Sequence, residues 1–331
     1  MKGKYGFIDR NGRIAIQPLF DRVRLFSEGL AVVTVGDKHG YVDENGHQAI
    51  PAHYDDAASF AEGLAAVKLG EKWGYIDKNG RWLIEPRFGS KFGGAGPFSE
   101  GLAPVLFNGK MGYIDHSGHF VIQPQFDFAE PFSEGLAAVG KVLQPGVSQL
   151  PAFGFVDRTG KTVVPLRYVS AGSFREGLAV VGIFRMGVKF YPQAVIDRTG
   201  KEVLALPDVG IGEFHEGLAE ISQFVNGKIG FMDRSGEEVI APRFESLEDT
   251  GPAVFSEGLA AVSLRNRLSG YIDRSGSMAI SAQFGLACPF RGGLALVFGR
   301  GRVGYIERNG KFIWSGPEKE MPENDEAGCF W

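Results

Sequence analysis

The stretch FSEGLAPVLFNGKMGYIDHSGHFVIQPQF, residues 98–126, contains one complete unit of a pattern that fills most of this 331-residue chain. Its first part, GLAPVLF, is rich in apolar residues and ends at Asn108-Gly109, a dipeptide that favours a two-residue β-hairpin. The returning segment KMGYID leads into the turn DHSG, and HFVIQP is a third apolar segment that a proline ends. The stretch therefore predicts a short three-stranded antiparallel meander.

The same pattern recurs along the chain. An Asp-x-x-Gly turn, or Glu-x-x-Gly in the last copy, recurs every 34–42 residues, about 37 on average. Its glycines are Gly12, Gly46, Gly80, Gly118, Gly160, Gly200, Gly236, Gly276 and Gly310. A second motif, Phe-x-Glu-Gly-Leu, begins at Phe26, Phe60, Phe98, Phe132, Phe174, Phe214 and Phe255, with a degenerate copy at Phe290. Two motifs in fixed order predict an all-β tandem-repeat array over residues 1–316, followed by an acidic, disordered tail over 317–331.

Each recurring residue has an expected structural role. Aspartate at the first turn position accepts backbone N–H groups as an Asx-turn, and glycine at the fourth position adopts a positive φ without steric cost. We expect the eight phenylalanines of the second motif to be structural anchors that fill the space between neighbouring units. The glutamates that follow them are expected to be hydrogen-bond acceptors rather than catalytic acids, and the Phe-Ser-Glu-Gly segment to form a single 3₁₀-like turn.

The number of copies bears on how the array is arranged. The second and third strands occur nine times and the first strand eight times, so the chain begins in mid-unit and ends with a whole unit. A propeller that closes by strand exchange would instead leave its last unit incomplete. This favours an open or spirally stacked β-array, and a closed eight-bladed β-propeller-like ring is the alternative.

KWGYID at 72–77, together with FSEGLA at 98–103, resembles the WG-repeat (KWG-repeat) family of bacterial proteins. The resemblance extends from Lys4 to about Trp314 and implies a repeat-built β-fold; it supplies no functional residues. The tryptophan of the family name occurs only at Trp73. The other copies hold Tyr5, His39, Met111, Phe153, Gln193, Ile229, Ser269 and Val303 at that place. Because the place accepts such different side chains, we expect a partly exposed scaffold position rather than a ligand-binding aromatic.

Charge and composition exclude several classes of function. The formal net charge is −4, and residues 318–326 alone carry five acids and one lysine, so the rest of the chain is about neutral. A neutral body lacks the clustered Lys and Arg that nucleic acids require, so no nucleic-acid partner is expected. The two cysteines, Cys288 and Cys329, do not indicate a disulfide framework. With no long apolar segment and no apolar leader, we expect a cytoplasmic protein without a membrane partner, provided that the chain starts here.

The sequence contains no convergent set of catalytic groups, and we expect neither an enzyme nor a cofactor. His116 and His119 flank one turn, but no third or fourth ligand accompanies them, so no metal site is expected. The repeated Asp turns resemble calcium ligands. Each offers one carboxylate, however, and in most copies Lys or Arg follows the acid, so turn chemistry is the better interpretation.

Two successive repeats lengthen the same hairpin, over residues 140–154 and 182–194. The second insertion contains Phe184, Arg185, Met186, Lys189, Phe190 and Tyr191, a mixture of residue types enriched at interface hot spots. These hairpins are a candidate protein-binding patch, unless they only cover the array or pack on each other. The sequence thus predicts a noncatalytic protein–protein interaction scaffold with an unidentified protein partner. A carbohydrate or cell-wall binding module, with a polysaccharide stacked on the aromatic hairpins, is the alternative.

Overall fold

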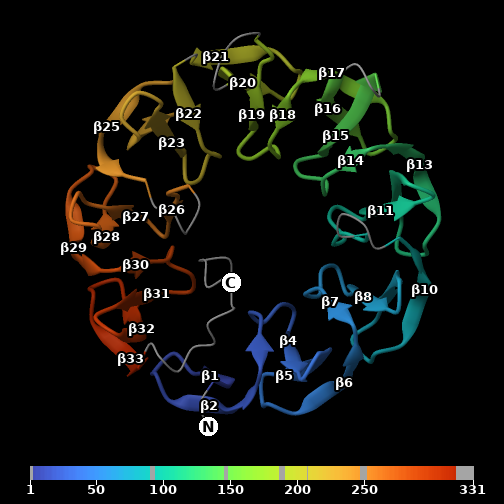
Figure 1. The fold of residues 1–331 in the computed structure, drawn as a ribbon, viewed down its shortest axis with the longest axis horizontal. Helices are drawn as coiled ribbons and strands as arrows, with labels where there is room; N and C mark the ends of the chain where they lie inside the picture. The colour runs from blue at the N-terminus through green and yellow to red at the C-terminus, as the bar shows by residue number, and fades with distance from the viewer. Residues whose placement is uncertain are drawn as a thin grey trace. The chain divides into compact units, whose positions relative to one another are not determined.

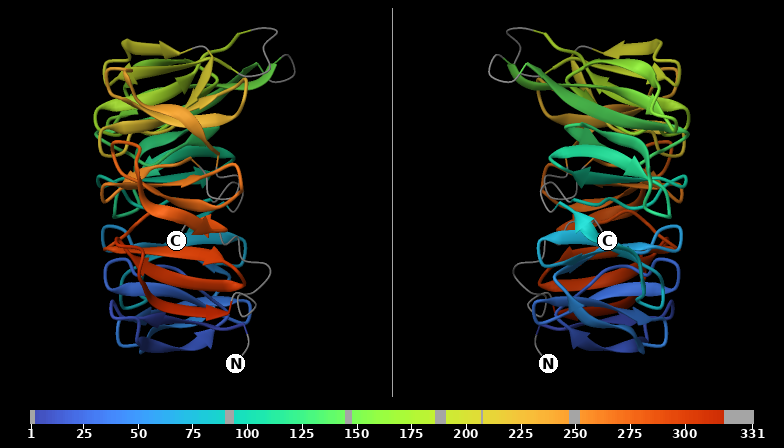
Figure 2. Two further views of the ribbon diagram at one scale, coloured as in Figure 1. Left: turned by 90° about the vertical axis from the view of Figure 1, so that its left-hand side faces the viewer. Right: turned by 90° about the vertical axis from the view of Figure 1, so that its right-hand side faces the viewer.

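The computed structural model describes residues 3–89, 94–144, 148–185, 191–206, 208–246 and 252–317. Every regular element in these ranges is a β-strand, which confirms the predicted all-β class (Figures 1 and 2). The chain forms two compact units. The first comprises residues 1–15, 188–195 and 202–331, and the second comprises residues 16–187 and 196–201.

Four kinds of strand recur. The first strands of the repeats are β4 (Leu30–Val35), β8 (Ala65–Leu69), β11 (Ala103–Phe107), β15 (Leu136–Gln144), β19 (Leu178–Gly182), β23 (Leu218–Gln223), β27 (Leu259–Ser263) and β31 (Leu294–Gly299). The second strands are β1 (Tyr5–Ile8), β5 (Lys38–Asp43), β9 (Lys72–Ile76), β12 (Lys110–Ile114), β16 (Ser148–Asp157), β20 (Gln193–Asp197), β24 (Lys228–Asp233), β28 (Ser269–Ile272) and β32 (Arg302–Glu307). The third strands are β2 (Ile14–Phe20), β6 (Gln48–Tyr54), β10 (Trp82–Phe88), β13 (Phe120–Phe126), β17 (Thr162–Tyr168), β21 (Glu202–Leu206), β25 (Glu238–Glu245), β29 (Met278–Phe284) and β33 (Phe312–Pro317). The short strands are β3 (Arg22–Val23), β7 (Asp56–Ala57), β14 (Phe128–Ala129), β18 (Ser170–Ala171), β22 (Val209–Ile211), β26 (Phe255–Ser256) and β30 (Leu286–Ala287).

The short strands other than β26 add a fourth member to the predicted three-stranded meander, whereas β26 contains the anchor Phe255 and pairs across the turn with β27. The strand orders β3-β4-β5-β6, β7-β8-β9-β10, β14-β15-β16-β17 and β30-β31-β32-β33 follow the chain, and every pairing between these neighbours is antiparallel. β11, β12 and β13 form a three-stranded sheet, and β22-β23-β24-β25-β27-β28-β29 is continuous, with β26 paired to β27. None of these sheets closes on itself within the described residues. The choice between an open array and an eight-bladed ring stays a prediction.

The turn before each first strand differs from the expected 3₁₀-like turn. In the copy at Ser99–Leu102, both central residues have positive φ, 53° at Glu100 and 82° at Gly101. Ser99 N–H donates to Leu102 O at 2.9 Å, and Leu102 N–H donates back at 3.2 Å. Two left-handed residues between two paired residues form a type I′ turn, whose twist suits antiparallel strands. The left-handed conformation of Glu100 was not predicted from the sequence.

The anchor phenylalanines pack between neighbouring repeats, as predicted. Phe98 lies with its ring centre 5.0 Å from that of Tyr75, and Phe132 lies 4.9 Å from Tyr113. Both belong to the seven anchors that are at most 3% exposed: Phe60, Phe98, Phe132, Phe174, Phe214, Phe255 and Phe290. Phe26 follows a repeat that has no first strand, and it is only half-buried. The core is therefore a row of contacts at the junctions between repeats, most of them aromatic pairs; at the junction of Phe214 the equivalent of Tyr113 is the buried Val195.

The position that Trp73 occupies in its repeat, here called the Trp place, is more buried than expected. Trp73, Met111, Ile229, Ser269 and Val303 are each at most 8% exposed, whereas the other copies are half-buried. This side chain lies opposite the last aromatic residue of the third strand, as in the pairs Trp73–Phe88 and Met111–Phe126. Its variation reflects different local packing in each repeat, so variability was a wrong indicator of exposure here. The scaffold role itself agrees with this burial.

The glycine that follows the Trp place is required by a bulge in the third strand. Met111 pairs with Phe126 and Tyr113 with Ile122, so two residues of β12 face four of β13. The bulge brings β13 across Gly112, where a Cβ atom would lie 2.7 Å from both Ile122 O and Pro124 N. Because only hydrogen fits there, the glycine is fixed by packing rather than by its dihedral angles.

The N-terminal turn packs on the last strand of the same unit. A Cβ atom at Gly12 would lie 2.1 Å from Ile313 O. Elsewhere this turn glycine lies against the third strand of the preceding repeat, as Gly118 does on Ile84. The first copy thus uses β33 as its preceding strand, and both ends of the repeat series belong to the first unit.

Candidate functional site: the lengthened hairpins

The first lengthened hairpin continues the regular pairing of β15 and β16. Its sibling β11–β12 ends at the pair Phe107–Lys110, which corresponds to Lys141–Ala152. β15 and β16 pair further, through Val142–Pro151 to Gln144–Ser148. Asp127 holds the base of the extension, because its Oδ2 accepts Val142 N–H at 2.9 Å. Burial tends to raise the pKa of Asp127, but its hydrogen bonds to Lys110 and Val142 bring the pKa below its usual value.

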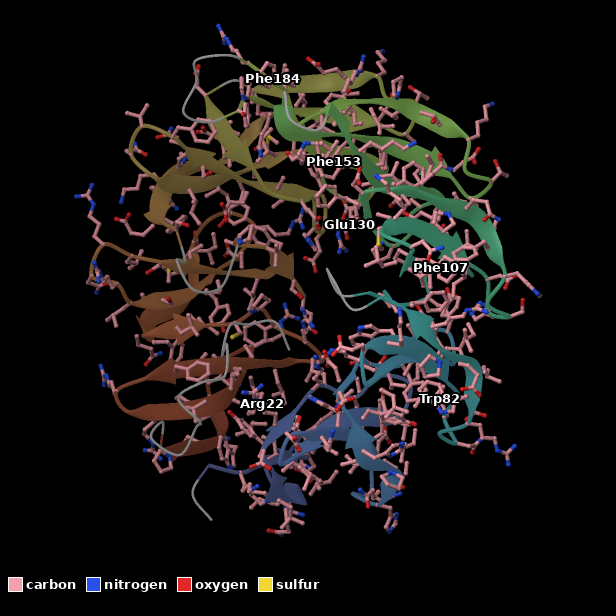
Figure 3. The ribbon with its side chains drawn as sticks, turned by 45° about the vertical axis from the view of Figure 1, so that its right-hand side comes forward. Arg22, Trp82, Phe107, Glu130, Phe153 and Phe184 are labelled. Atoms are coloured by element: carbon pink, nitrogen blue, oxygen red, sulfur yellow. The ribbon has the colours of Figure 1, made fainter. Side chains whose placement is uncertain are left out.

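A pair of aromatic rings lies beside this hairpin. The ring centres of Phe128 on β14 and Phe153 on β16 are 5.6 Å apart (Phe153 is labelled in Figure 3). The absence of a side chain at Gly140 makes room for Phe153, since a Cβ atom there would lie 2.7 Å from the ring. Phe128 remains 37% exposed. The sequence analysis did not single out Phe128. Its equivalents in other short strands, including Asp56 and Ser170, are not aromatic, and this difference between the copies was the signal that could have identified it.

The described residues of the second hairpin are exposed. Phe184 is 52% exposed and Arg185 is also exposed, and both belong to the second unit (Phe184 is labelled in Figure 3). Tyr191, which belongs to the first unit, is 37% exposed. Met186, Lys189 and Phe190 lie outside the described residues. The exposure of Phe184 is opposite to the burial of the anchor phenylalanines, so this side chain is not part of the core.

The recurring glutamates accept hydrogen bonds from the next repeat. Glu100 Oε2 accepts Gly135 N–H at 2.9 Å, so the turn of one repeat binds the same turn of its successor. The same contact occurs at Glu28–Gly63, Glu62–Gly101, Glu134–Gly177, Glu216–Gly258 and Glu257–Gly293. Where serine precedes the glutamate, its hydroxyl adds a bond, as from Ser99 to Phe132 O at 2.7 Å. These glutamates are structural acceptors, as expected.

The Asp turns are Asx-turns, and a lysine or arginine beside the acid contacts the preceding repeat, as Lys78 and Arg274 show. Asp77 Oδ1 accepts the N–H groups of Asn79 and Arg81, both at 2.9 Å. The neighbouring Lys78 reaches the Glu-Gly turn of the preceding repeat, with Nζ 2.9 Å from Glu28 O and 3.2 Å from Glu28 Oε2. Arg274 makes the same contact with Glu216 O at 2.7 Å. The carboxylate oxygens of Asp77 and Glu28 thus take part in contacts that stabilise the fold.

The two neighbouring histidines contact different partners. His116 stacks on Phe98 with ring centres 4.3 Å apart, and its Nε2 atom lies 3.2 Å from Glu62 Oε2. His119 Nδ1 lies 2.6 Å from Ser117 Oγ. Within the described ranges, no group of three or more His, Cys, Asp or Glu side chains is arranged to hold a metal ion. In the same ranges, no helix is long and apolar enough to cross a membrane.

Comparisons with known proteins agree with the repeat pattern. A family described as "WG containing repeat" matches residues 5–38, 40–73, 73–110, 111–141, 153–183, 229–267 and 270–298. No curated protein matches the chain. A crystal structure of the eukaryotic initiation factor is similar, with a TM-score of 0.63, 10% identity, and coverage of 89% of this chain and 88% of that one. BamB from Moraxella catarrhalis covers 92% of this chain and 95% of its own at 12% identity, with a TM-score of 0.46. At these identities, the likeness to the initiation factor concerns the fold alone.

Proposed function

Because the chain belongs to the family built from WG-containing repeats, and its repeats are built from β-strands, we propose that it is a noncatalytic protein-interaction scaffold. The recurring Glu, Ser, Asp and Tyr side chains bind other parts of the same array, which leaves the departures from the pattern to provide function. The partner would bind at the lengthened hairpins.

The observation that carries the proposal is the exposure of two phenylalanines that do not belong to the repeat pattern. Phe184 is 52% exposed and Phe128 is 37% exposed, while the anchors other than Phe26 are at most 3% exposed. Burying a phenylalanine against a partner is worth about 1.5–3 kcal/mol, which makes such side chains effective anchors at interfaces. Arg185 is exposed next to Phe184 and supplies the kind of polar contact that accompanies aromatic anchors.

The test compares two double variants, each of which replaces two exposed apolar side chains by serine. Phe128→Ser with Phe184→Ser changes the proposed surface. Leu83→Ser with Val121→Ser, at side chains that are 57% and 44% exposed on third strands, is the matched control. Proteins captured from the source-cell lysate by the unchanged chain should be identified by mass spectrometry and their binding measured by titration.

We expect the control to bind the captured protein as the unchanged chain does, and the Phe128/Phe184 variant to bind at least tenfold more weakly. Equal binding by all three proteins would refute the surface. If the unchanged chain captures no protein but co-sediments with insoluble polysaccharide, the scaffold proposal is wrong and the carbohydrate-binding alternative replaces it.

A further inference from the structure

β23 holds a buried carboxyl group at a place where every other repeat has an apolar residue. Glu220 is 9% exposed and follows the Gly-Leu-Ala segment of its repeat. The equivalent residues are Val32, Ala66, Pro104, Ala138, Val180, Ala261 and Leu296. A buried acid without a cation is costly, so its presence calls for a specific role.

The other junctions show what Glu220 replaces. Tyr113 donates its hydroxyl to Glu130 O at 2.7 Å, and Glu130 lies two residues before the anchor Phe132. Three further tyrosines reach the corresponding carbonyl in the next repeat at the same distance: Tyr41 to Ala58, Tyr75 to Gly96, and Tyr271 to Cys288. A side-chain hydrogen bond thus fastens the segment before the anchor to the preceding repeat.

The repeat that contains Glu220 has no hydroxyl at this place. Phe231 stands where the tyrosine would be, directly opposite Glu220 in the β23–β24 pairing. Glu220 Oε2 instead accepts the N–H of Ala253, which lies two residues before the anchor Phe255. The carboxyl group therefore binds the same residue of the next repeat that a tyrosine binds elsewhere. Unlike a tyrosine hydroxyl, a carboxyl group whose pKa is raised to about 7 by burial changes its charge near neutral pH.

Among the residues that the structure describes, the other charged groups around this junction either have partners elsewhere or are exposed. On β24, Lys228 pairs with Glu245, and Asp233 accepts Ser235 N–H. Next to β22, Oε2 of Glu213 lies 3.9 Å from Nε2 of His215, and Asp208 is exposed. After β26, Glu257 accepts Gly293 N–H. Burial raises the pKa of Glu220 to about 7, and the hydrogen bond from Ala253 opposes that rise only in part.

We propose that the contact between Glu220 and Ala253 is a proton-controlled joint between two repeats. With Glu220 protonated, its uncharged carboxyl group accepts the Ala253 N–H and the segment 252–255 stays packed on β23. With Glu220 ionised, a buried charge depends on one N–H donor, and the segment opens to admit water. The joint is closed in mildly acidic conditions and loosens as the pH rises.

The direction in which stability changes with pH follows from proton linkage. The pKa of Glu220 is raised in the folded protein, so between about pH 4.5 and 7 the folded state binds more protons than the unfolded state. Stability therefore falls as the pH rises through this window and levels off above it. One pKa unit corresponds to a tenfold change in the opening equilibrium constant, so we expect a change of tenfold or more between pH 5 and pH 8.

Hydrogen exchange followed by mass spectrometry tests the joint, with rates corrected for the intrinsic effect of pH. Peptides that cover residues 218–224 and 252–260 should lose protection at pH 8 relative to pH 5 in the unchanged chain. They should keep it in Glu220→Gln, which retains an acceptor without a charge. Glu238→Gln changes an exposed acid on β25 of the same repeat, outside both peptides, and should behave like the unchanged chain.

A second variant keeps the test decisive if Glu220→Gln does not fold. Glu220→Ala combined with Phe231→Tyr restores the arrangement found at the tyrosine junctions, and its protection should not depend on pH. The proposal is refuted if the unchanged chain and either folded variant show the same dependence of protection on pH.

Discussion

Gly112 gives the most direct test of how the repeat is packed. Gly112→Ala would place a Cβ atom 2.7 Å from Ile122 O and Pro124 N, while ordinary contact begins at 3.4 Å. Both neighbours are backbone atoms, so β12 and β13 must separate locally by about 0.7 Å. Overpacking of this kind costs about 1–3 kcal/mol, and each hydrogen bond weakened between the strands adds up to about 1 kcal/mol. We expect a destabilisation of roughly 3 kcal/mol.

Gly109→Ala is the matched control in the same hairpin. Gly109 has a φ of 79°, and a Cβ atom on this residue would meet no other atom within 4 Å, so only the left-handed backbone opposes alanine. That conformation costs an ordinary residue about 1–2 kcal/mol. The two variants therefore separate packing from backbone strain.

Thermal unfolding monitored by near-UV circular dichroism measures the difference. For a unit of this size, 1 kcal/mol shifts the Tm by about 2–4 °C. Gly112→Ala should lower the Tm by roughly 6–12 °C, and Gly109→Ala by about half as much. If Gly109→Ala lowers the Tm as much as Gly112→Ala or more, the bulge does not explain why glycine follows the Trp place.

Three further changes test the junctions, the turns and the ends of the chain. Tyr113→Phe removes the hydroxyl that binds Glu130 O, and it should cost about 1–2 kcal/mol and speed hydrogen exchange over residues 128–132. The Arg81 N–H holds the pKa of Asp77 below its usual value, so the stability that this acid contributes is present above about pH 4 and lost as the pH falls through the lowered pKa. Asp77→Asn should therefore reduce the acid-dependent part of a urea-unfolding series taken from pH 5 to pH 2. Deletion of residues 1–15 removes the turn that packs on Ile313 and should raise hydrogen exchange over residues 312–317, without the same effect over 82–88.

The sequence predicted the features that depend only on residues within one repeat. Asp-x-x-Gly indicates an Asx-turn, Asn108-Gly109 indicates a hairpin, and the recurring phenylalanines indicate buried anchors; the structure contains all three. Each depends on local conformation or on an apolar side chain with a fixed place in the repeat. Local rules of this kind are readable without tertiary information.

The features that were missed depend on contacts between segments. The Trp place is buried by a third strand that bulges over its hairpin, and no local pattern announces that bulge. The short strands have two or three residues, too few for a periodic pattern. Phe128 and Glu220 were nevertheless visible to self-comparison, because each departs from its equivalents in the other repeats. Comparing every position across the copies would have found both.

The contact between Gly12 and Ile313 also sets the order in which the chain can fold during synthesis. The second unit is almost continuous in sequence and is inserted between segments of the first, so its residues leave the ribosome while the first unit is still incomplete. The N-terminal turn must wait for β33, about 300 residues later, which takes roughly 15–60 s at typical rates of synthesis. We therefore expect ribosome-bound chains that end before β33 to contain a folded second unit and an accessible N-terminal segment.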